Sequence, residues 1–418
     1  MLVGAPHRFL PRTLADEHLE ELGRLTDTAG GEVVGTIVQR IDKPHPQYYV
    51  GKGKALELAE LVQETEGDLV IFDEELTPAQ GKNLEELLDV RVMDRSELIL
   101  DIFATRARSS EARMQVELAQ LQYLLPRLRR MWNHLSRIRG GIGLRGPGET
   151  QLETDRRLIG TRIGDLRRKL KEVEKARAVQ RKNRAGSYKA SLVGYTNAGK
   201  SSLLQALSGA DLFVEDRLFA TLDSATRSVD LGSGYEALVT DTVGFIRKLP
   251  HHLVASFRST LEEAGEADVL LHVIDASHPD WEEQREVVIE VLADLRLEKR
   301  DKILVFNKID RITYAEEESL RQRMRALEAT PSVFVSAHDD STLHPLRETL
   351  CARVRSRLME VRVRVPVADG ETMAELYRVG EVLERVDENM EVLIKARVPG
   401  LFLGRLTDRE GVVVEDLS

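Results

Sequence analysis

KASLVGYTNAGKSSLLQALSG, residues 189–209, is an apolar run, a loop of the form G-x-x-x-x-G-K-S and an apolar-periodic segment. This order predicts a buried strand, a glycine-rich loop and a helix. Backbone N–H groups of such a loop wrap phosphate oxygens, and the helix N-terminus adds its positive dipole end. Lys200 would neutralise the β- and γ-phosphates, while the hydroxyl of Ser201 would bind Mg²⁺. The predicted phosphate contacts are Gly194, Tyr195, Thr196, Asn197, Ala198, Gly199, Lys200, Ser201 and Ser202.

Two later segments complete a predicted phosphate and metal site. YEALVTDTVGF, residues 235–245, is an apolar strand ending in Asp241, which would hold a water of the Mg²⁺ shell. LFATLDSATR, residues 218–227, contains Thr221, the predicted switch threonine. We therefore predict Lys200, Thr221 and Gly244 as catalytic residues, and Ser201, Thr221 and Asp241 as metal ligands, the last through water. The predicted nucleotide contacts of these segments are Phe219, Ala220, Thr221, Leu222, Asp223, Asp241, Thr242, Val243 and Gly244.

The choice of base is also readable. KILVFNKID, residues 302–310, is an apolar strand followed by N-K-x-D, and SVFVSAH, residues 332–338, follows it. A carboxylate at Asp310 would accept hydrogen bonds from guanine N1–H and the 2-amino group, which adenine does not offer. Sites built this way reject the wrong partner by about 10⁴-fold or more. These segments predict GTP and GDP as ligands, with base contacts at Asn307, Lys308, Ile309, Asp310, Ser336, Ala337 and His338.

Position 245 bears on the rate of hydrolysis. Many signalling GTPases have a glutamine after D-x-x-G that orients the attacking water, whereas this chain has Phe245, which cannot hydrogen-bond water. We predict slow intrinsic hydrolysis, with the missing group supplied by another residue or by a partner. Arg247 and Lys248 lie nearby, and we expect them to be surface or partner contacts rather than a self-supplied arginine finger.

Composition limits the class of protein. The 418 residues are 42% hydrophobic and 31% charged, which is typical of a soluble globular protein of two to four domains. A single cysteine, Cys351, excludes an internal disulfide and cysteine-based zinc or redox pairs, which favours a reducing compartment. No apolar run approaches the roughly 18 residues of a membrane span. We expect a cytoplasmic protein without a membrane span.

Charge is distributed unevenly along the chain. The net charge is −10, but residues 106–186 contain 21 Lys and Arg against 8 Asp and Glu, a local charge of +13. A cationic block in an acidic protein indicates a polyanion-binding surface. The alternative is a solvated helical face, which normally mixes its signs.

The same block has two heptad seams separated by a glycine-rich loop. Apolar residues step by four and three from Met114 to Leu135, and again from Ile159 to Val173. Two such helices, of roughly 25 residues each, predict an antiparallel hairpin about 35 to 40 Å long. It would be kinked at Pro126, and its seams are short enough to be satisfied in a monomer. RGGIGLRGPG, residues 139–148, would form its tip, where arginines supply forked donors for phosphate. The predicted RNA contacts are Arg139, Gly140, Gly141, Gly143, Arg145, Gly146 and Gly148.

The remaining regions read as small α/β modules. Residues 1–105 alternate apolar runs at 32–38, 68–74 and 90–94 with helical stretches, which predicts a largely parallel sheet. Their GKGK run, residues 51–54, is either an anion site or a turn opening a helix.

The predicted fold is α/β: residues 187–356 form a P-loop GTPase domain with a doubly wound, mostly parallel sheet. Residues 1–105 form an N-terminal domain, 106–186 the basic hairpin and 357–418 a C-terminal module. In that module ETMAELYRVGEVLERV, residues 371–386, predicts a single helix.

LRGPGETQLETDRR (144–157), together with YTNAGKS, LFATLD, DTVGFI and NKID, resembles the HflX family of bacterial ribosome-associated GTPases. The resemblance covers residues 30–355 strongly, and the glycine loop is its most specific part. It implies binding of the large ribosomal subunit (rRNA) and GTP-dependent splitting of stalled or dormant ribosomes under stress. Leu144 stands where the family usually has threonine, and Ser224–Ala225 replace its usual Pro-Thr.

Two other functions fit parts of the sequence. A signalling GTPase with a protein partner explains the nucleotide motifs but leaves the basic hairpin without a role. An ATP-driven RNA remodeller would use the GKGK loop of residues 51–54 and would keep hydrolysing ATP after Lys200→Ala. We expect the ribosome-directed GTPase.

Overall fold

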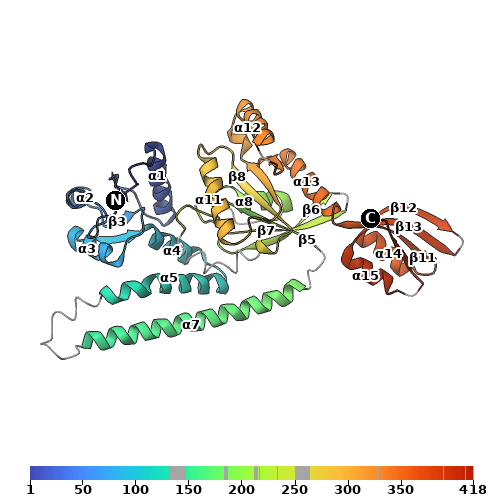
Figure 1. Ribbon diagram of the computed structural model, residues 1–418, viewed down its shortest axis with the longest axis horizontal. Coiled ribbons are helices and arrows are strands. Elements are labelled where there is room, and N and C mark those ends of the chain that lie inside the picture. Colours follow the sequence, from blue (N-terminus) through green and yellow to red (C-terminus); the bar gives the residue numbers. More distant parts are fainter. Residues whose placement is uncertain are drawn as a thin grey trace.

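Three sheets and a long helical hairpin follow one another in the computed structural model of the chain (Figure 1). The structure describes residues 1–131, 147–182, 187–210, 215, 217–232, 234–249, 264–327, 329–388, 390–409 and 411–417. Within them no helix combines the length and apolarity needed to cross a bilayer.

The first sheet has four strands in the order β2-β1-β3-β4, all parallel. Its strands and helices are β1 (Leu2–Gly4), α1 (Arg12–Thr28), β2 (Thr36–Val38), α2 (Lys52–Glu64), β3 (Leu69–Phe72), α3 (Pro78–Leu88) and β4 (Arg91–Asp94). The expected parallel sheet is present, with one strand more than expected, because β1 lies at its centre. The GKGK run opens α2, where the Gly51 N–H donates to Gln39 Oε1 at 2.7 Å.

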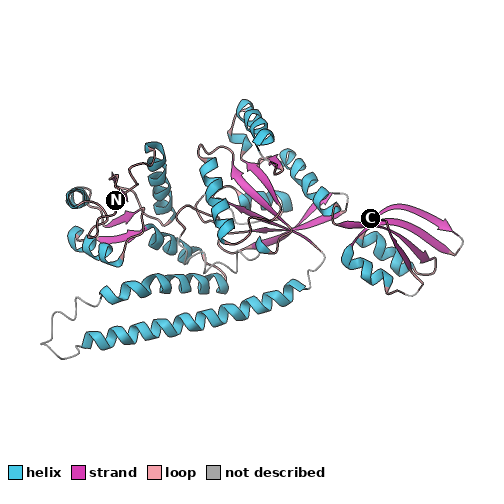
Figure 2. Ribbon diagram, in the orientation of Figure 1, coloured by secondary structure: helices cyan, strands magenta, loops and turns pink. Residues whose placement is uncertain are grey.

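Two long helices form the described part of the hairpin. Helix α4 (Arg95–Arg106) leads into α5 (Ser110–Met131), and α7 (Pro147–Lys182) returns alongside α5 (Figures 1 and 2). The expected seams meet, since Leu118 packs with Ile163 and Leu166. Helix α5 continues through Pro126, and α7 is 36 residues long, more than the roughly 25 expected for each arm.

The expected tip loop falls largely outside the described residues. Arg139, Gly140, Gly141, Gly143, Arg145 and Gly146 lie in the segment 132–146, which the structure does not describe. Gly148 is described, and it lies in the first turn of α7 rather than in the loop. Proline at the first helical position, here Pro147, is pre-organised for a helix start, which explains why the helix begins there.

The second sheet has six strands in the order β10-β9-β8-β5-β7-β6. All neighbours are parallel except the edge pair β6 and β7, as expected for a doubly wound, mostly parallel sheet. Its strands are β5 (Tyr188–Gly194), β6 (Ala225–Gly232), β7 (Tyr235–Asp241), β8 (Val269–Asp275), β9 (Lys302–Asn307) and β10 (Ser332–Phe334).

Helices cover both faces of this sheet. Consecutive residues of β5 point to opposite faces, so Leu192 packs in one apolar cluster and Val193 in another. The Leu192 face is covered by α8 (Lys200–Ser208) and α13 (His344–Arg355), and the opposite face by α11 (Trp281–Asp294). Helix α12 (Tyr314–Leu327) packs through Met324 beside β9 and β10.

The third sheet is antiparallel, in the order β12-β13-β11-β14. The chain runs β11 (Leu358–Pro366), α14 (Gly370–Val379), β12 (Glu381–Glu388), β13 (Glu391–Pro399), α15 (Gly400–Thr407) and β14 (Val413–Asp416). A single helix over 371–386 was expected, and this is wrong after Val379. A Cβ at Gly380 would lie 2.9 Å from Val398 Cγ1 of β13. The residues that follow Gly380 form β12, which pairs with β13 instead of continuing the helix.

Candidate nucleotide-binding and switch site

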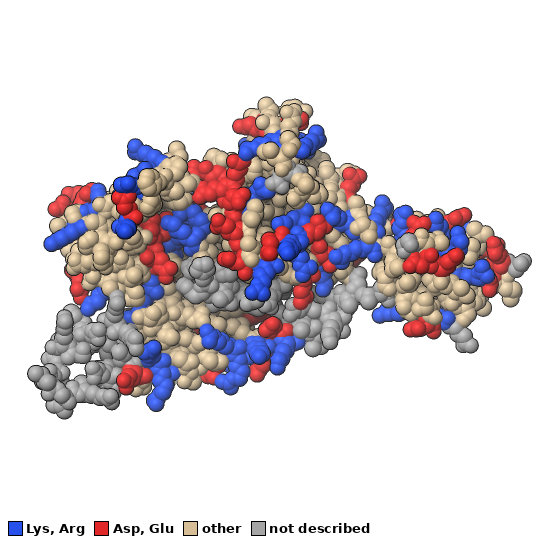
Figure 3. Space-filling model, in the orientation of Figure 1, with Lys and Arg blue, Asp and Glu red and all other residues tan. Residues whose placement is uncertain are grey.

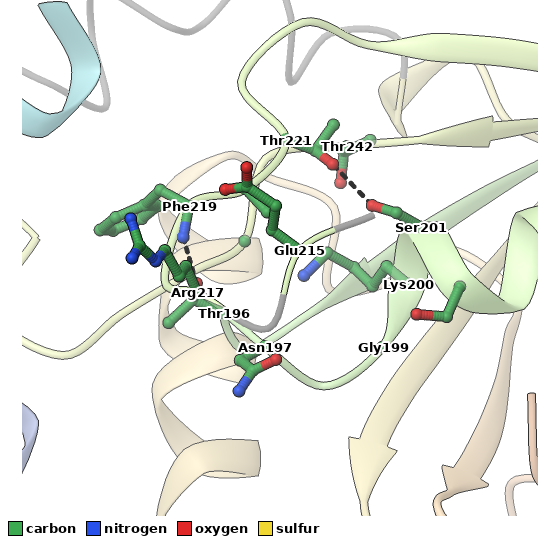
Figure 4. Close-up of a pocket in the computed structure, with 13 residues that line it drawn as sticks. Thr196, Asn197, Gly199, Lys200, Ser201, Glu215, Arg217, Phe219, Thr221 and Thr242 are labelled. Atoms are coloured by element: carbon green, nitrogen blue, oxygen red, sulfur yellow. Dashed lines mark hydrogen bonds between the residues drawn. The ribbon is translucent and has the colours of Figure 1, made fainter. Parts of the chain in front are cut away.

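The loop between β5 and α8 fits its predicted phosphate-binding shape. Gly199 has φ +89°, in the left-handed region, and a Cβ there would lie 2.3 Å from Asn307 Nδ2. Glycine is therefore required by conformation and by the close approach of the base-binding loop. The chain then enters α8 at Lys200, so the first N–H groups of that helix face the pocket drawn in Figure 4.

Lys200 is poised inside the loop. Its ammonium donates to the carbonyls of Gly194 at 3.1 Å and Tyr195 at 2.9 Å, and the residue is 6% exposed. Burial lowers the pKa of Lys200 to about 8, although Asp241 favours the charged form. A buried cation that donates to two carbonyl oxygens is suited to exchange these for phosphate oxygens.

The three predicted metal ligands converge. Figure 4 shows Ser201 Oγ beside Thr221 Oγ1, 2.6 Å away. Ser201 Oγ also donates to Asp241 Oδ2 at 2.5 Å. Asp241 is 2% exposed, burial raises its pKa, and its Oδ1 is buried without a hydrogen-bond partner among the described residues. An unpartnered buried carboxylate oxygen beside two hydroxyls fits a hydrated Mg²⁺. Within the described residues, no group of three or more His, Cys, Asp and Glu side chains forms another metal site.

Gly244 and Phe245 connect the strand-end loop after β7 to the phosphate loop. The Phe245 N–H donates to the Gly194 carbonyl at 3.0 Å, and the Phe245 carbonyl accepts from the Thr196 N–H at 2.6 Å. A Cβ on Gly244 would lie 2.6 Å from Thr196 Cα and 3.0 Å from Lys200 Nζ. The Phe245 ring is 2% exposed and packs in the apolar core, so it does not reach the pocket.

The base motif is held against the opposite side of the phosphate loop. Asn307 Nδ2 donates to the Ala198 carbonyl at 2.9 Å, and its Oδ1 accepts from the Ala337 N–H at 3.2 Å. Ser336 Oγ donates to Asp310 Oδ1 at 2.6 Å, which orients that carboxylate. The His338 N–H donates back to Ser336 Oγ at 3.2 Å, while Ile309 packs in an apolar cluster.

The contacts of Lys308 identify Asp275, a residue of the site that the sequence did not predict. Its ammonium donates to the Asn197 carbonyl at 2.8 Å and to Asp275 Oδ2 at 2.6 Å. Asp275 ends β8, and a carboxylate at the end of an apolar strand was the signal that could have identified it. Thr342 was missed too: its Oγ1 accepts from the Ser336 N–H at 2.8 Å.

The predicted nucleotide contacts divide by position. Those that line the phosphate pocket are Thr196, Asn197, Gly199, Lys200, Ser201, Ser202, Phe219, Ala220, Thr221, Thr242 and Gly244, joined by Glu215 and Arg217, which were not predicted. The lining does not include Gly194, Tyr195, Ala198, Asp241 and Val243. Leu222 is buried in the apolar core, and the Asp223 carboxylate bonds to Ser109 and the N–H of Arg108 instead of facing the pocket.

Arg247 occupies a place that its sequence position did not predict. A surface or partner contact was expected rather than an arginine finger, and the surface position is wrong, since the residue is 8% exposed. Its guanidinium lies 3.0 Å from Glu21 Oε1 and 3.3 Å from Asp73 Oδ2, both in the N-terminal region. Lys248 follows it, 2.7 Å from Asp73 Oδ2, with its side chain 40% exposed. Arg95 pairs with the same two carboxylates, and Lys248 also pairs with Glu74. These six charged groups form one cluster that joins the N-terminal region to the segment after Gly244.

Three family models match the chain in succession. Residues 16–104 match one described as "GTP-binding GTPase N-terminal", residues 106–184 "GTP-binding GTPase Middle Region" and residues 189–308 "50S ribosome-binding GTPase".

Curated relatives cover almost the whole chain. A GTPase HflX of Magnetococcus marinus is 46% identical over 99% of this chain and 96% of its own. The GTPase HflX of Escherichia coli is 43% identical over 98% of this chain and 96% of its own. Among solved structures, a GTP-binding protein from Sulfolobus solfataricus in complex with GDP is 24% identical over 85% of this chain and 99% of its own, with a TM-score of 0.44.

Proposed function

Because the chain belongs to the GTPase HflX family, we propose that its GTP form binds the large ribosomal subunit and dissociates stalled or dormant ribosomes under stress. Hydrolysis to GDP and phosphate would then release it. The protein would act as a monomer in the cytoplasm. The observation that carries the ribosome as partner is the cationic surface of the hairpin.

That surface is open to a polyanion. Lys and Arg side chains follow the described part of the hairpin along its lower edge in Figure 3. Among the described residues of α7, the exposed cations are Arg156, Arg157, Arg162, Arg167, Arg168, Lys169, Lys171 and Lys175. Ion pairs occupy two of them, Arg162 with Glu117 and Arg168 with Asp165. The apolar seam faces α5, which leaves these cations for phosphate.

The hydrolytic roles follow from the geometry of the site. Lys200 would exchange its two carbonyl partners for β- and γ-phosphate oxygens, and the N–H of Gly244 would bind the γ-phosphate. Ser201, Thr221 and, through water, Asp241 would hold Mg²⁺, which neutralises charge developing on the phosphates. Asp310 and Asn307 would select and position guanine.

Slow hydrolysis in isolation is part of the proposal. The phenyl ring of Phe245 is packed in the core, and Arg247 is held by Glu21 and Asp73, so neither side chain reaches the γ-phosphate position. The ribosomal partner would therefore supply or order the group that orients the attacking water.

The test is the rate of GTP hydrolysis with and without large subunits at low and moderate salt. We expect strong stimulation that weakens with salt, because counterions compete with the hairpin. Replacing residues 140–148 by a short Gly/Ser turn should abolish it. Arg156→Gln with Arg157→Gln should weaken it, whereas the matched pair Arg362→Gln with Arg364→Gln in β11 should not. Absence of stimulation would favour the protein-binding signalling GTPase.

Splitting needs its own measurement. Whole ribosomes incubated with the protein and a non-hydrolysable GTP analogue should separate into subunits in a sucrose gradient, while GDP should leave them intact. Binding to free large subunits without loss of whole ribosomes would restrict the function to subunit binding.

A further inference from the structure

The segment that carries Thr221 is tied to the root of the hairpin by a carboxylate. Asp223 Oδ2 accepts hydrogen bonds from the N–H groups of Arg108 and Ser109, both at 3.1 Å, and its Oδ1 accepts from the Ser109 hydroxyl. Ser109 Oγ in turn accepts from the Ala112 N–H at 3.0 Å, in the first turn of α5. Ser109 therefore caps the first turn of α5, and Ser109 is itself held by Asp223, a residue more than 100 positions away.

Apolar contacts run beside this polar link. The rings of Phe219 and Phe103 meet edge to face with centroids 4.7 Å apart, and both residues are 1% exposed. Leu222 shares one continuous apolar cluster with Ala112 and Val116 of α5. Such a core does not deform continuously, so a shift of α5 must be followed by the residues packed on it.

A third link joins the same two parts on the other side of Thr221. Arg106, the last residue of α4, donates to Glu215 Oε2 at 2.5 Å, and Glu215 lines the phosphate pocket. Thr221 is thus bracketed by attachments to the α4–α5 corner, at Glu215 and Phe219 before it and at Asp223 after it.

We propose that Asp223 is a positioning residue that transmits the orientation of the hairpin to Thr221, and through Thr221 to bound GTP. Only Leu222 separates the two residues, so their Cα atoms are at most about 7 Å apart. A displacement at the start of α5 therefore reaches the Thr221 hydroxyl, 2.6 Å from Ser201 Oγ. By linkage, a partner that moves the hairpin changes affinity for GTP relative to GDP, and GTP changes affinity for that partner by the same factor.

The inference rests on the proposed function for its partner but not for its internal link, so the first experiment needs no ribosome. Amide hydrogen exchange in the first turn of α5 is compared between the GDP and GTP-analogue forms of the full-length protein. We expect slower exchange in the GTP-analogue form, because Thr221 and Asp223 are then ordered together. Equal exchange in the two forms of the unmodified protein would overturn the proposal.

Two variants weaken the link. Asp223→Asn removes the charge and one acceptor, and Ser109→Ala removes a donor that lies outside the phosphate pocket; both should erase the nucleotide-dependent difference in exchange. Asp369→Asn is the matched control, since Asp369 accepts from the Thr372 N–H as the N-cap of α14. We expect Asp369→Asn to keep the nucleotide-dependent difference in exchange. Loss of that difference in Asp369→Asn, as in Asp223→Asn, would overturn the proposal.

The second experiment measures the ratio of GTP-analogue to GDP affinity with and without large subunits. We expect the subunits to change the ratio by about fivefold or more in the unmodified protein and by much less in Ser109→Ala. An unchanged coupling in Ser109→Ala and Asp223→Asn overturns the proposal. Nucleotide-dependent exchange without any effect of subunits instead removes the ribosome as partner and leaves the link intact.

Discussion

The Tyr195 hydroxyl of the phosphate loop donates a hydrogen bond to Glu21 in α1, 174 positions earlier in the chain. The same hydroxyl accepts from the Arg247 N–H at 3.0 Å, so one side chain joins the phosphate loop, the segment after Gly244 and the N-terminal region. Both partners are buried, and Arg95 and Arg247 share the Glu21 carboxylate. The nucleotide site is thus supported from outside its own sheet.

The first prediction concerns this charge cluster. Arg247→Ala would remove one of the three cations that face the carboxylates of Glu21, Asp73 and Glu74, which costs roughly 3–5 kcal/mol of unfolding free energy. Chemical denaturation of the full chain measures the loss. Arg362→Ala is the control: its side chain is 44% exposed and paired with Glu415, so it should cost about 0–1 kcal/mol. Equal losses in the two variants would contradict a supporting role for the cluster.

The second prediction concerns pH at the contact between α1 and α11. Burial, followed by a hydrogen bond with Asp280, raises the pKa of Glu17 to about 7 from its ordinary value of 4.5. Because the folded-state pKa is the higher one, the contribution of Glu17 to stability is fully present below about 4.5 and is lost as the pH rises through about 7. Glu17→Gln should therefore stabilise the protein above pH 7 and change it little below 4.5.

Thermal unfolding across this pH range tests it. A stabilisation by Glu17→Gln of the same size at every pH would mean that the pKa of Glu17 is not raised by folding.

The third prediction concerns base choice. In Asp310→Asn an NH₂ group replaces one carboxylate oxygen and cannot accept the hydrogen bond from the guanine 2-amino group. GTP affinity should therefore fall by about 10⁴-fold. The amide nitrogen would instead donate to the C2 carbonyl of xanthine, so affinity for xanthosine triphosphate should rise. Titration with fluorescent forms of both nucleotides measures the exchange. A parallel fall for both would indicate unfolding of the loop rather than altered recognition.

The fourth prediction concerns Phe245. Restoring a glutamine there should not accelerate intrinsic hydrolysis, because the side chain at this position points into the core. Phe245→Gln loses the ring contacts and buries an amide, so it should lower stability by about 3–5 kcal/mol, as core Phe truncations do. Phe9→Gln, at a position 76% exposed, is the matched control. A faster single-turnover rate in Phe245→Gln would show that this side chain can reach the attacking water.

The fifth prediction concerns the contact between the phosphate and base loops. Gly199→Ala places a methyl group 2.3 Å from Asn307 Nδ2 at a φ of +89°, so both loops must move. We expect loss of GTP and GDP binding together. Gly53→Ala, where a Cβ meets nothing within 4 Å, should bind both nucleotides normally. Calorimetric titration with each nucleotide distinguishes the two variants.

The sequence predicted those parts whose cause is local. The strand–loop–helix at residues 189–209 and the seams that bring Leu118 to Ile163 follow from periodicity and loop chemistry within one segment. The prediction of a helix as far as residue 386 was wrong because Gly380 lies against β13, a contact that exists only in the folded sheet. The prediction of a surface position for Arg247 was wrong for the same reason, since its carboxylate partners lie 174 or more positions earlier. Charged side chains are rarely buried unless paired, and single-sequence reasoning does not reveal such distant pairs.

The apolar cluster shared by α4, α5 and the segments around Phe219 and Phe245 also bears on how the chain is made. Domains fold as they emerge, beginning with the N-terminal one. The faces of α4 and α5 that receive Phe219 are therefore synthesised about 100 residues before their partner. A nascent chain halted in that interval exposes them to chaperones, and a GTPase domain expressed alone exposes the other half.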